Sequence, residues 1–397
     1  MAFKDMPYGI DFVVEQDLVP LGIKKIPNSK GYNFNCPFCA KALGKQDKHH
    51  KYSVNIYKNV GHCFKCGASH GVLSLHAELC GLTLKEAAED LDKRWNNLPV
   101  DTKTKLSQVK DKLEEENSKQ LEPAPTEILD DIYKKFLNQL TLSDKHKQDL
   151  LKRGLSEEQI EKGMYKTVPQ VGFVSIAKNC FDYETKDVFK RHYKWGVPGF
   201  YDIRKEPKFV RCDSGYFVPV RNEFGQIAGM QIRYDALKEG ASEEKKNHYA
   251  KYKWFTSNFR ELEGGCSATG CENIHYASYS QFNSNLKTVM LTEGVLKADV
   301  ASYLGGKIKG KEPIPILGLV GVYNTQNLNF ELAKLKMKGL EKVIIAVDMD
   351  YLEKKQVAQA LADIESRIEE VGLKHEMFKW DPKYKGIDDF LLEVSMK

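Results

Sequence analysis

The sequence predicts a multidomain α+β protein, in which a small four-cysteine module with an antiparallel sheet precedes a mixed α/β core. Three observations support this. Two C-x-x-C pairs lie near the N-terminus, with a strand-like alternation of apolar residues between them. A polar, Lys/Glu-rich stretch that closes on prolines follows. Over the last part of the chain, apolar strands alternate with helical segments, which predicts a parallel sheet covered on both faces.

The bulk composition is that of an ordinary globular protein. The chain has 397 residues, of which 42% are hydrophobic and 29% charged, so we expect two or three domains with sizeable cores. It has no run of 18 apolar residues, and its start lacks the basic and apolar segments of a signal peptide. We therefore expect no membrane association and a cytoplasmic location, which would be the bacterial host's cytoplasm for a phage-encoded chain.

Changes in composition and in the pattern of apolar residues divide the chain into four expected parts. The cysteine module covers residues 1–95, and two short helices near its end should break at Gly81, with Thr83 as a cap. A charged linker, flexible or partly helical, covers 96–126. A helical and basic subdomain covers 127–284, and a metal-binding α/β domain covers 285–397.

Individual strands and helices of the core can be placed from their patterns. In the basic subdomain, residues 217–233 are expected to form a strand, a turn and a second strand. In the last domain we expect strands at Thr288–Thr292, Val343–Val347 and Lys374–Lys379, with a long amphipathic helix over Leu352–Val371.

The cysteine spacing predicts a zinc ribbon. Two pairs separated by 23 residues can each wrap one side of a tetrahedral ion. With four protein ligands no position is open for water, so one zinc ion should be structural. Buried free thiols or a redox C-x-x-C are the alternatives, and the paired spacing disfavours both. The expected ligands are Cys36, Cys39, Cys63 and Cys66.

Basic residues surround these cysteines. From Leu18 to Cys66 there are nine lysines and a single acid, Asp47, which favours a polyanionic partner. The candidate nucleic-acid contacts are Lys41, Lys51 and Lys65. Aromatic residues interleave with the lysines and could stack on unpaired bases, although about half of them should simply fill the small core. These aromatics are Phe34, Phe38, Tyr52, Tyr57 and Phe64.

Acidic residues follow the expected strands of the last domain. Glu293 ends one strand, Asp348 and Asp350 follow the next, and Asp388 and Asp389 come after the third. Because the carboxyl ends of parallel strands converge at one sheet edge, these acids can share a Mg²⁺ or Mn²⁺ site. A single acid at a strand end is commonly a turn or cap residue, but three strand ends in succession favour a metal site.

The N-terminal module resembles the zinc-binding domain of bacterial DnaG-type primases over roughly residues 28–95. The resemblance is carried by Cys36–Cys39, Tyr52–Asn55, His62–Ala68 and Gly81–Ala88. Those proteins usually have His at the place of Cys39, and an all-cysteine site is similar to that of certain phage primase-helicases. The resemblance implies that this module recognises template DNA.

The last domain resembles the Toprim domain shared by bacterial primases, topoisomerases and some nucleases, over about residues 285–394. Glu-Gly after one strand, Asp-x-Asp after the next and a later acidic pair carry this resemblance. Residues 217–229 and 251–257 are similar to the polymerase half of the DnaG core. Segments at 153–156, 197–200, 292–299 and 385–389 are more similar still to a little-characterised Toprim-like family of phages and mobile elements.

The resemblance implies roles for acidic and basic residues of the core. Metal ions would be held by Glu293, Asp348, Asp350, Asp388 and Asp389, and phosphates would be contacted by Arg221, Arg233, Lys251 and Lys253. One position departs from the DnaG pattern: Lys297 stands where those primases carry an Asp, and Asp299 comes two residues later. We expect the Lys297 amine to reach the acidic site, repel a second metal ion and attract a triphosphate or the template backbone. The alternative is that it turns away to pair with a surface acid.

These motifs and resemblances therefore predict a DNA primase that makes short RNA primers from NTPs on single-stranded DNA. No G-x-x-x-x-G-K-[ST] motif occurs, so a separate replicative helicase is the expected partner. A Toprim nuclease and a non-catalytic nucleic-acid-binding protein of a phage or mobile element remain as alternatives. A type I topoisomerase is disfavoured, because nothing marks a strand-cleaving tyrosine domain.

Overall fold

The structure is a computed structural model that describes most of the chain in two compact units. The first unit comprises the N-terminal residues up to Lys119, and the second nearly all residues from Gln120 to Lys397. The described residues are 6–28, 30–106, 108, 121–181, 196–203, 206–237, 249–258, 264–268, 274–282, 286–310, 312–321, 324–325, 327–349 and 355–396. The boundary lies inside the stretch expected to be a linker, where residues 100–106 are helical. None of the described helices is both long enough and apolar enough to span a bilayer.

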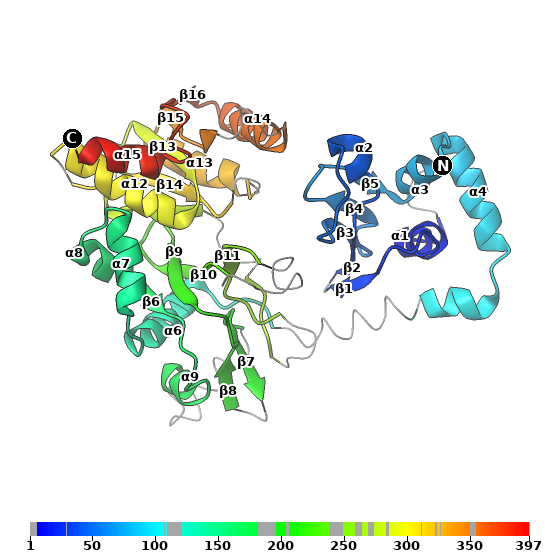
Figure 1. Cartoon of the computed structure of the whole chain (residues 1–397), viewed down its shortest axis with the longest axis horizontal. Coiled ribbons are helices and arrows are strands. Elements are labelled where there is room, and N and C mark those ends of the chain that lie inside the picture. Colours follow the sequence, from blue (N-terminus) through cyan, green and yellow to red (C-terminus); the bar gives the residue numbers. More distant parts are fainter. Residues whose placement is uncertain are drawn as a thin grey trace. The chain divides into compact units, whose positions relative to one another are not determined.

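The first unit is built on a five-stranded antiparallel sheet in the order β1-β2-β3-β4-β5 (Figure 1). The expected alternation is confirmed in β3, where Tyr52 and Val54 are buried and their neighbours half-buried. Opposite pairs such as Tyr52 and Cys63 bring the second cysteine pair beside the core. The strands are β1 Ile26–Asn28, β2 Gly31–Phe34, β3 Tyr52–Asn55, β4 Val60–Cys63 and β5 Ser69–Gly71.

Short helices complete this unit. The predicted break is confirmed, because Gly81 ends α3 in a left-handed conformation with φ of +69°. The predicted cap is confirmed too: the Thr83 hydroxyl accepts the Glu86 N–H at 3.3 Å, and the Glu86 carboxylate accepts the Thr83 N–H at 2.8 Å. The helices are α1 Ile10–Val13, a π-helical turn Val14–Leu18, α2 Cys39–Leu43, α3 Val72–Cys80 and α4 Leu84–Asn96.

The second unit begins with helices packed on a four-stranded sheet in the order β11-β10-β9-β6. The predicted strand, turn and strand are confirmed by the β9–β10 hairpin. In its turn the Asn222 side chain accepts the N–H groups of Phe224 and Gln226, both at 3.0 Å, and Gly225 has φ of +75°. The strands are β6 Lys166–Thr167, β9 Gly215–Arg221, β10 Ile227–Tyr234 and β11 Tyr252–Trp254, with a separate hairpin of β7 Phe200–Ile203 and β8 Glu206–Phe209. The helices are α6 Thr126–Asn138, α7 Asp144–Lys152, α8 Glu157–Gly163 and α9 Ser175–Cys180.

The C-terminal part of this unit contains a five-stranded mixed sheet in the order β12-β14-β13-β15-β16. Four strands run parallel, as predicted, and β12 forms an antiparallel edge. The sequence analysis did not predict β12 or β14. A short 3₁₀ turn, Tyr279–Gln281, follows β12. The strands are β12 Ile274–Ala277, β13 Thr288–Glu293, β14 Ile316–Leu319, β15 Lys342–Ile345 and β16 Lys374–Met377.

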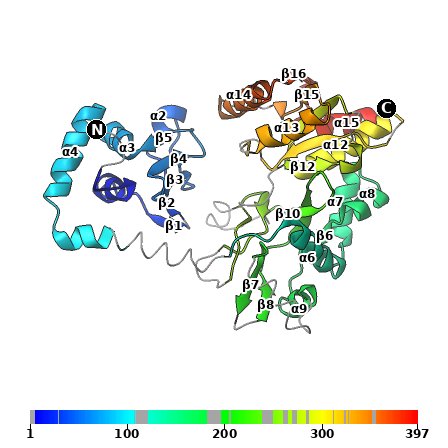
Figure 2. The ribbon, with the colours of Figure 1, turned by 180° about the vertical axis from the view of Figure 1, so that it is seen from behind.

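Helices cover both faces of the mixed sheet, as the apolar strands predicted. Apolar residues of α13 and α14 pack with the strands in one core cluster. Residues of α12 pack against the other face, where α15 lies beside α12 in both views (Figure 1, Figure 2). The helices are α12 Val295–Ile308, α13 Leu328–Met337, α14 Lys355–Glu370 and α15 Ile387–Ser395.

An aromatic cluster forms the core beneath the four-stranded sheet. Phe136 of α6 is fully buried at its centre. Its ring centroid lies 5.1–5.8 Å from those of four other phenylalanines, a spacing typical of attractive ring pairs. These are Phe200, Phe209, Phe217 and Phe255. One helix side chain therefore joins the hairpin, the sheet and the loop after β11.

Replacing Phe136 with Ala should lower the free energy of unfolding of the second unit by about 3–5 kcal/mol, because a large buried ring is lost and a cavity remains. Phe224→Ala is the matched control, since that ring is 70% exposed at the hairpin turn, and its effect should stay within about 0.5 kcal/mol. Urea unfolding followed by tryptophan fluorescence measures both. Equal effects of the two substitutions would contradict this account of the core.

Candidate functional site

The four predicted zinc ligands lie together in the first unit. The Sγ atoms of Cys36 and Cys66 are 3.6 Å apart, and those of Cys39 and Cys63 are 3.7 Å apart. All four sulfur atoms lie within 4.8 Å of one another. A tetrahedral zinc ion with Zn–S bonds of about 2.3 Å places its sulfurs about 3.8 Å apart. The cluster therefore has the spacing of a closed metal site.

The first cysteine pair is positioned by Asp47, which the sequence analysis counted only as a lone acid. Its buried carboxylate accepts the backbone N–H groups of Cys36 at 2.9 Å, His49 at 2.9 Å and Lys51 at 2.7 Å. Burial opposes the charged form, but these three hydrogen bonds outweigh it and hold the pKa of Asp47 below its ordinary value. Asp47 thereby fixes the loop that begins at the first cysteine pair, Cys36 and Cys39.

The second cysteine pair is arranged to keep Cys63 as a thiolate. The Cys36 thiol donates to Cys63, and the backbone N–H groups of Cys66 and Lys65 each lie 3.4 Å from its Sγ. Against the effect of burial, these hydrogen bonds lower the pKa of Cys63 to about 5. The pKa of the neighbouring Cys36 is raised, since its thiol is hydrogen-bonded to Cys63 and buried, so the thiolate charge of the cluster lies on Cys63.

The aromatics around this cluster divide into core and surface residues. Phe34, Phe38 and Tyr52 are buried and Tyr57 is half-buried, whereas Phe64 is 66% exposed. The Phe64 ring lies 5.0 Å from the His62 ring, edge to face. Lys41 and Lys51 are exposed, and the half-buried Lys65 donates to the Gln46 carbonyl at 3.3 Å. A basic surface with one prominent aromatic ring results.

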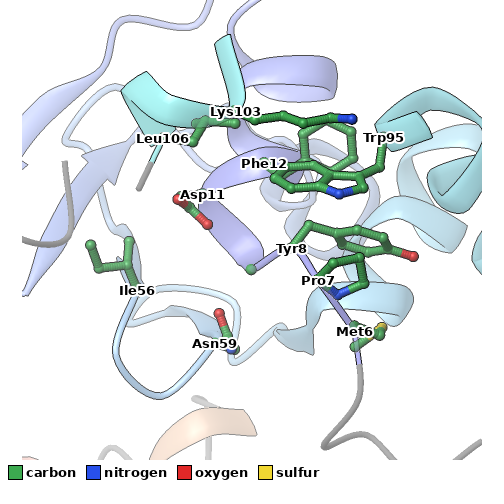
Figure 3. A pocket seen from close by; sticks show the side chains of 11 residues that line it. Met6, Pro7, Tyr8, Asp11, Phe12, Ile56, Asn59, Trp95, Lys103 and Leu106 are labelled. Carbon is green, nitrogen blue, oxygen red and sulfur yellow. The ribbon is translucent and has the colours of Figure 1, made fainter. Parts of the chain in front are cut away.

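The first unit also contains a cavity of about 330 Å³ away from the cysteines. Tyr8, Phe12 and Trp95 form an aromatic wall, and the Lys103 amine lies 5.5 Å from the Trp95 ring centroid (Figure 3). The Tyr8 hydroxyl donates to Asp92 at 2.7 Å. The contacts that close this wall join the N-terminal helix to α4.

In the second unit, the ends of β13 and β15 bring two of the predicted metal ligands together. Glu293 ends β13, and Asp348 follows β15 on the neighbouring parallel strand. The Thr292 hydroxyl donates to the Ala346 carbonyl at 2.7 Å and ties these strand ends to each other. The amine of Lys297, one turn into α12, contacts the Asp348 carboxylate and lies 3.4 Å from Glu293 Oε1.

Asp388 enters the same site from the first turn of α15. It is 7% exposed, and its Oδ1 atom has no hydrogen-bond partner among the described residues. The Arg153 guanidinium lies 3.8 Å from the other carboxylate oxygen. Gly386 closes the site: a Cβ atom there would lie 2.4 Å from Asp388 Oδ1 and 3.2 Å from the Lys297 side chain. A side chain at Gly386 would therefore displace the acidic group, and the sequence analysis did not single this glycine out.

The remaining predicted acids have different outcomes. Asp389 is exposed, and its carboxylate accepts the Gly386 N–H at 3.4 Å as part of the α15 cap. Asp350 lies outside the described residues. The structure thus gathers Glu293, Asp348 and Asp388 and places Asp389 at the helix cap.

The protonation of this site reflects burial and charge pairing. Burial raises the pKa of Glu293 to about 7, with Asp348 adding to the shift and Lys297 opposing it. Burial also raises the pKa of Asp388, against the effects of Lys297 and Arg153. Although burial favours the neutral amine, the carboxylates of Glu293, Asp348 and Asp388 raise the pKa of Lys297. The alternative of a pairing with a surface acid is not what the structure shows.

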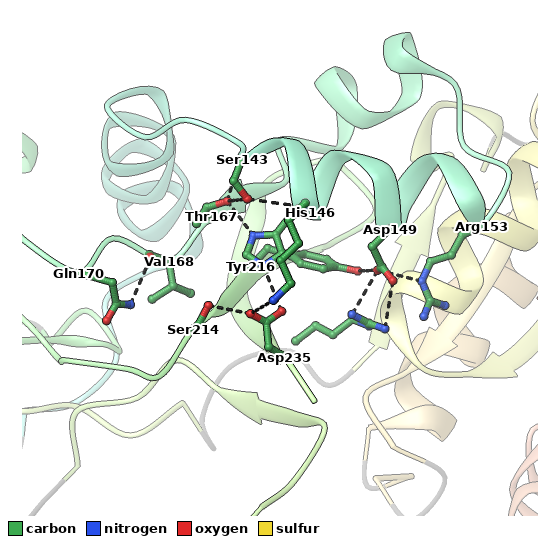
Figure 4. Close-up of polar contacts among 12 residues, drawn as sticks. Ser143, His146, Asp149, Arg153, Thr167, Val168, Gln170, Ser214, Tyr216 and Asp235 are labelled. Atoms are coloured by element: carbon green, nitrogen blue, oxygen red, sulfur yellow. Dashed lines mark hydrogen bonds and ion pairs between the residues drawn. The ribbon is translucent and has the colours of Figure 1, made fainter. Parts of the chain in front are cut away.

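Asp149 of α7 holds two arginines, of which Arg153 reaches the acidic group (Figure 4). Asp149 accepts from Arg153 at 3.3 Å, from the Tyr216 hydroxyl at 2.8 Å and from Arg233 at 3.1 Å. Arg233 also lies over the Tyr216 ring, and its Nε atom is buried without a partner among the described residues. The same figure shows His146 held between Thr167 and Asp235, which fixes α7 on the sheet.

The other predicted phosphate contacts do not form one patch. The Lys251 side chain is exposed, although protein atoms remove part of the water around its amine. This partial desolvation, and then the charges of Arg233 and Arg153, lower the pKa of the amine. Lys253 pairs with Ile232 in the sheet, whereas Arg233 pairs with Tyr252, so Lys253 and Arg233 point to opposite faces.

Arg221 instead holds the backbone. Its guanidinium donates to the carbonyls of Lys162, Gly163 and Gly225 at 3.2–3.4 Å. These bonds connect the hairpin turn to the end of α8, which is a structural task.

Asp299 does not replace the missing acid at position 297. It accepts the Tyr165 hydroxyl at 2.6 Å and faces His275 Nε2 at 2.9 Å. The Arg221 backbone N–H donates to His275 Nδ1 at 3.0 Å, so the proton of His275 lies on Nε2 and is donated to Asp299. Through these contacts, Asp299 connects α12 to β12 and to the basic subdomain.

Comparisons with known proteins found one family model and a similarity to a bacterial DNA primase. A family model described as "Domain of unknown function (DUF3854)" matches residues 281–397. The DNA primase of Thermotoga maritima is 27% identical over 202 residues, which cover 49% of this chain and 30% of that protein. The match therefore spans less than a third of the length of this curated relative.

Solved primase structures also match. The Aquifex aeolicus primase, with its zinc-binding and RNA polymerase domains, is 13% identical with a TM-score of 0.49; the match covers 98% of this chain and 83% of that one. The primase fragment of the bacteriophage T7 primase-helicase is 12% identical with a TM-score of 0.32, over 62% of this chain and 69% of that one. The sequence match to the Thermotoga protein confirms that this chain is similar to bacterial DNA primases.

Proposed function

We propose that this chain is a DNA primase that synthesises short RNA primers from NTPs on single-stranded DNA during replication. The observation that carries the proposal is the acidic group of Glu293, Asp348 and Asp388 at the carboxyl end of a mixed sheet, with Arg153 beside Asp388. The sequence similarity of the chain to the Thermotoga primase supports this proposal. In this assignment the site acts on phosphates in the bacterial cytoplasm, and a separate replicative helicase supplies unwound template.

The donor set at the acidic site fits a hard divalent cation. Asp388 offers a buried, unpartnered carboxylate oxygen, and oxygen ligands are what Mg²⁺ and Mn²⁺ prefer. Such an ion, when bound, neutralises charge on the reacting phosphates. Asp348 and Glu293 supply further carboxylates, and Arg153 can orient a phosphate because its guanidinium is held by Asp149.

In the first unit, the proposed roles are zinc binding and template contact. The four thiolates would hold one structural zinc ion and so fix the loops that carry the exposed Phe64, Lys41 and Lys51. An exposed ring can stack on an unpaired base while nearby lysines attract the DNA backbone.

The nuclease and the non-catalytic binding protein lead to different observations. Labelled NTPs incubated with random single-stranded DNA should give products that grow from a few nucleotides while the template stays intact. Loss of template would support the nuclease. Tight DNA binding with neither synthesis nor cleavage would support the non-catalytic protein, which is the alternative that the lysine in the acidic site favours.

Removal of one thiolate should remove the zinc. Wild-type protein should carry one zinc ion per chain by elemental analysis, and Cys63→Ser should lose most of it after dialysis against a chelator, because a closed site needs all four ligands. The unfolding transition of the second unit should not change, since the cluster lies in the other compact unit. Cys212→Ser is the control, as that thiol lies in the second unit. Retention of zinc in Cys63→Ser would refute the ligand set.

Loss of the exposed ring should weaken template binding. Phe64→Ala should reduce affinity for single-stranded DNA by about 1–3 kcal/mol, the usual contribution of one stacked base, whereas Phe64→Trp should retain it. Leu43→Ala, at an exposed apolar residue of α2, is the control. Fluorescence anisotropy with a labelled oligonucleotide measures all four proteins. If Phe64→Ala binds as tightly as wild type, Phe64 has no stacking role.

Loss of a buried carboxylate should stop synthesis but spare binding. Asp348→Asn should lower primer synthesis by roughly 100-fold or more, because a carboxylate that holds the cations of the site in place is lost, and those cations would neutralise charge on the reacting phosphates. Its affinity for single-stranded DNA should stay within about twofold, since lysines and aromatics supply that affinity. Asp381→Asn, at an exposed acid, is the control. Parallel loss of binding and synthesis would indicate that Asp348 is structural.

A further inference from the structure

Lys297 occupies an unusual place for a lysine, between two carboxylates at the centre of the acidic group. Its amine contacts Asp348 and lies 3.4 Å from Glu293 Oε1, and its side chain is only 17% exposed. Glu293 and Asp348 come from neighbouring parallel strands, so the space between their carboxylates is where a shared cation would sit. The amine fills that space.

Cations of the protein already lie beside each carboxylate of this group that the structure describes. Each carboxylate has a cationic neighbour within 4 Å: Glu293 and Asp348 share Lys297, Lys385 lies 3.8 Å from Asp348, and Arg153 lies 3.8 Å from Asp388. Arg153 is shared with Asp149, and the Lys385 side chain is largely exposed. Among the described residues, Lys297 is therefore the buried cation that serves this group alone. A divalent ion placed beside its amine would bring like charges close together, which is strongly disfavoured when they are buried.

The chain also closes around the amine. Gly386, in the loop before α15, is so close that an added Cβ would lie 3.2 Å from Lys297 Cε and 3.3 Å from Asp348 Oδ1. An ion could therefore enter this space only if this loop or the Lys297 side chain moved away. Asp388 Oδ1 differs from the other oxygens of Glu293, Asp348 and Asp388. Among the described residues, it alone of these oxygens is buried without a hydrogen-bond partner.

We propose that the amine of Lys297 is a built-in cation that takes the place of one divalent ion, so that the acidic site binds a single Mg²⁺ or Mn²⁺ on its Asp388 side. The amine then supplies the charge that holds Glu293 and Asp348 together, and the bound ion uses the oxygen that the protein leaves unpaired. The role of this ion in primer synthesis rests on the proposed function, but its stoichiometry does not.

The number of Mn²⁺ ions bound by the full-length, zinc-loaded protein tests the proposal directly. Electron paramagnetic resonance of free Mn²⁺ gives this number without any measurement of activity. Wild type should bind one ion at this site, and Asp388→Asn should lose it. Lys297→Asp should bind two, because the amine is replaced by a further ligand, and Lys297→Gln should also gain the second ion, because Glu293 and Asp348 are released.

Lys307→Asp is the matched control, since it makes the same charge change at an exposed position of the same helix. It should bind one ion, as wild type does. Two ions in wild type, none in wild type, or equal numbers in wild type and Lys297→Gln would each overturn the proposal. Circular dichroism shows which variants are folded, and the wild-type number decides the question even if Lys297→Asp is not.

The outcome is separable from that of the proposed function. A protein that binds one Mn²⁺ but makes no primers would retain the single-ion site and lose the primase assignment. A protein that makes primers and binds two ions beside Lys297 would retain the assignment and lose the built-in cation. Where both hold, the dependence of synthesis on Mn²⁺ should change from first order in wild type to second order in Lys297→Asp.

Discussion

The burial of three carboxylates at one sheet edge is the constraint on which the arrangement of the second unit depends. Parallel pairing of β13 and β15 forces Glu293 and Asp348 together, and the first turn of α15 adds Asp388. Such a group is unstable unless cations enter with it, because water no longer screens the charges. Lys297 from α12 and Arg153 from the end of α7 supply those cations. The start of α12 and the end of α7 therefore lie where their cations can neutralise the acidic group.

Asp149 extends this constraint into the basic subdomain. It holds Arg153 on one side and Arg233 on the other, with the Tyr216 hydroxyl as a further donor. Arg153 touches both Asp149 and Asp388, so a single guanidinium connects the helical subdomain to the mixed sheet. This connection accounts for a feature that the expected domain boundaries did not contain: residues on either side of position 285 form one compact unit.

Local patterns predicted the strands and the metal-ligand spacing, but not the partners of long side chains. Cysteine spacing and apolar runs act within a few residues, so the thiolate cluster and the ends of β13 and β15 could be placed from them. Helix phase, by contrast, decides between adjacent acids, which is why Asp388 is buried while Asp389 caps the helix. The apolar run of the short β14 contains Gly318, which weakens the strand pattern in the sequence, and strand register is set only by tertiary pairing.

The partners of basic side chains could not be predicted from the sequence either, and these partners decide which residues are available to bind a substrate. Arginine and lysine reach several ångströms from the backbone, so a motif cannot say whether an arginine meets a phosphate, a carbonyl or an acid. Arg221 meets carbonyls and Arg233 meets Asp149, whereas Lys251 stays exposed. The buried Lys297 and Arg153 thus offset charge of the buried acids, and in the proposed function the long-range attraction for a polyanionic substrate is left to exposed lysines such as Lys251. Because exposed charges are screened within about 8–10 Å at moderate salt, substrate capture in this arrangement depends on ionic strength, while the geometry of the acidic group does not.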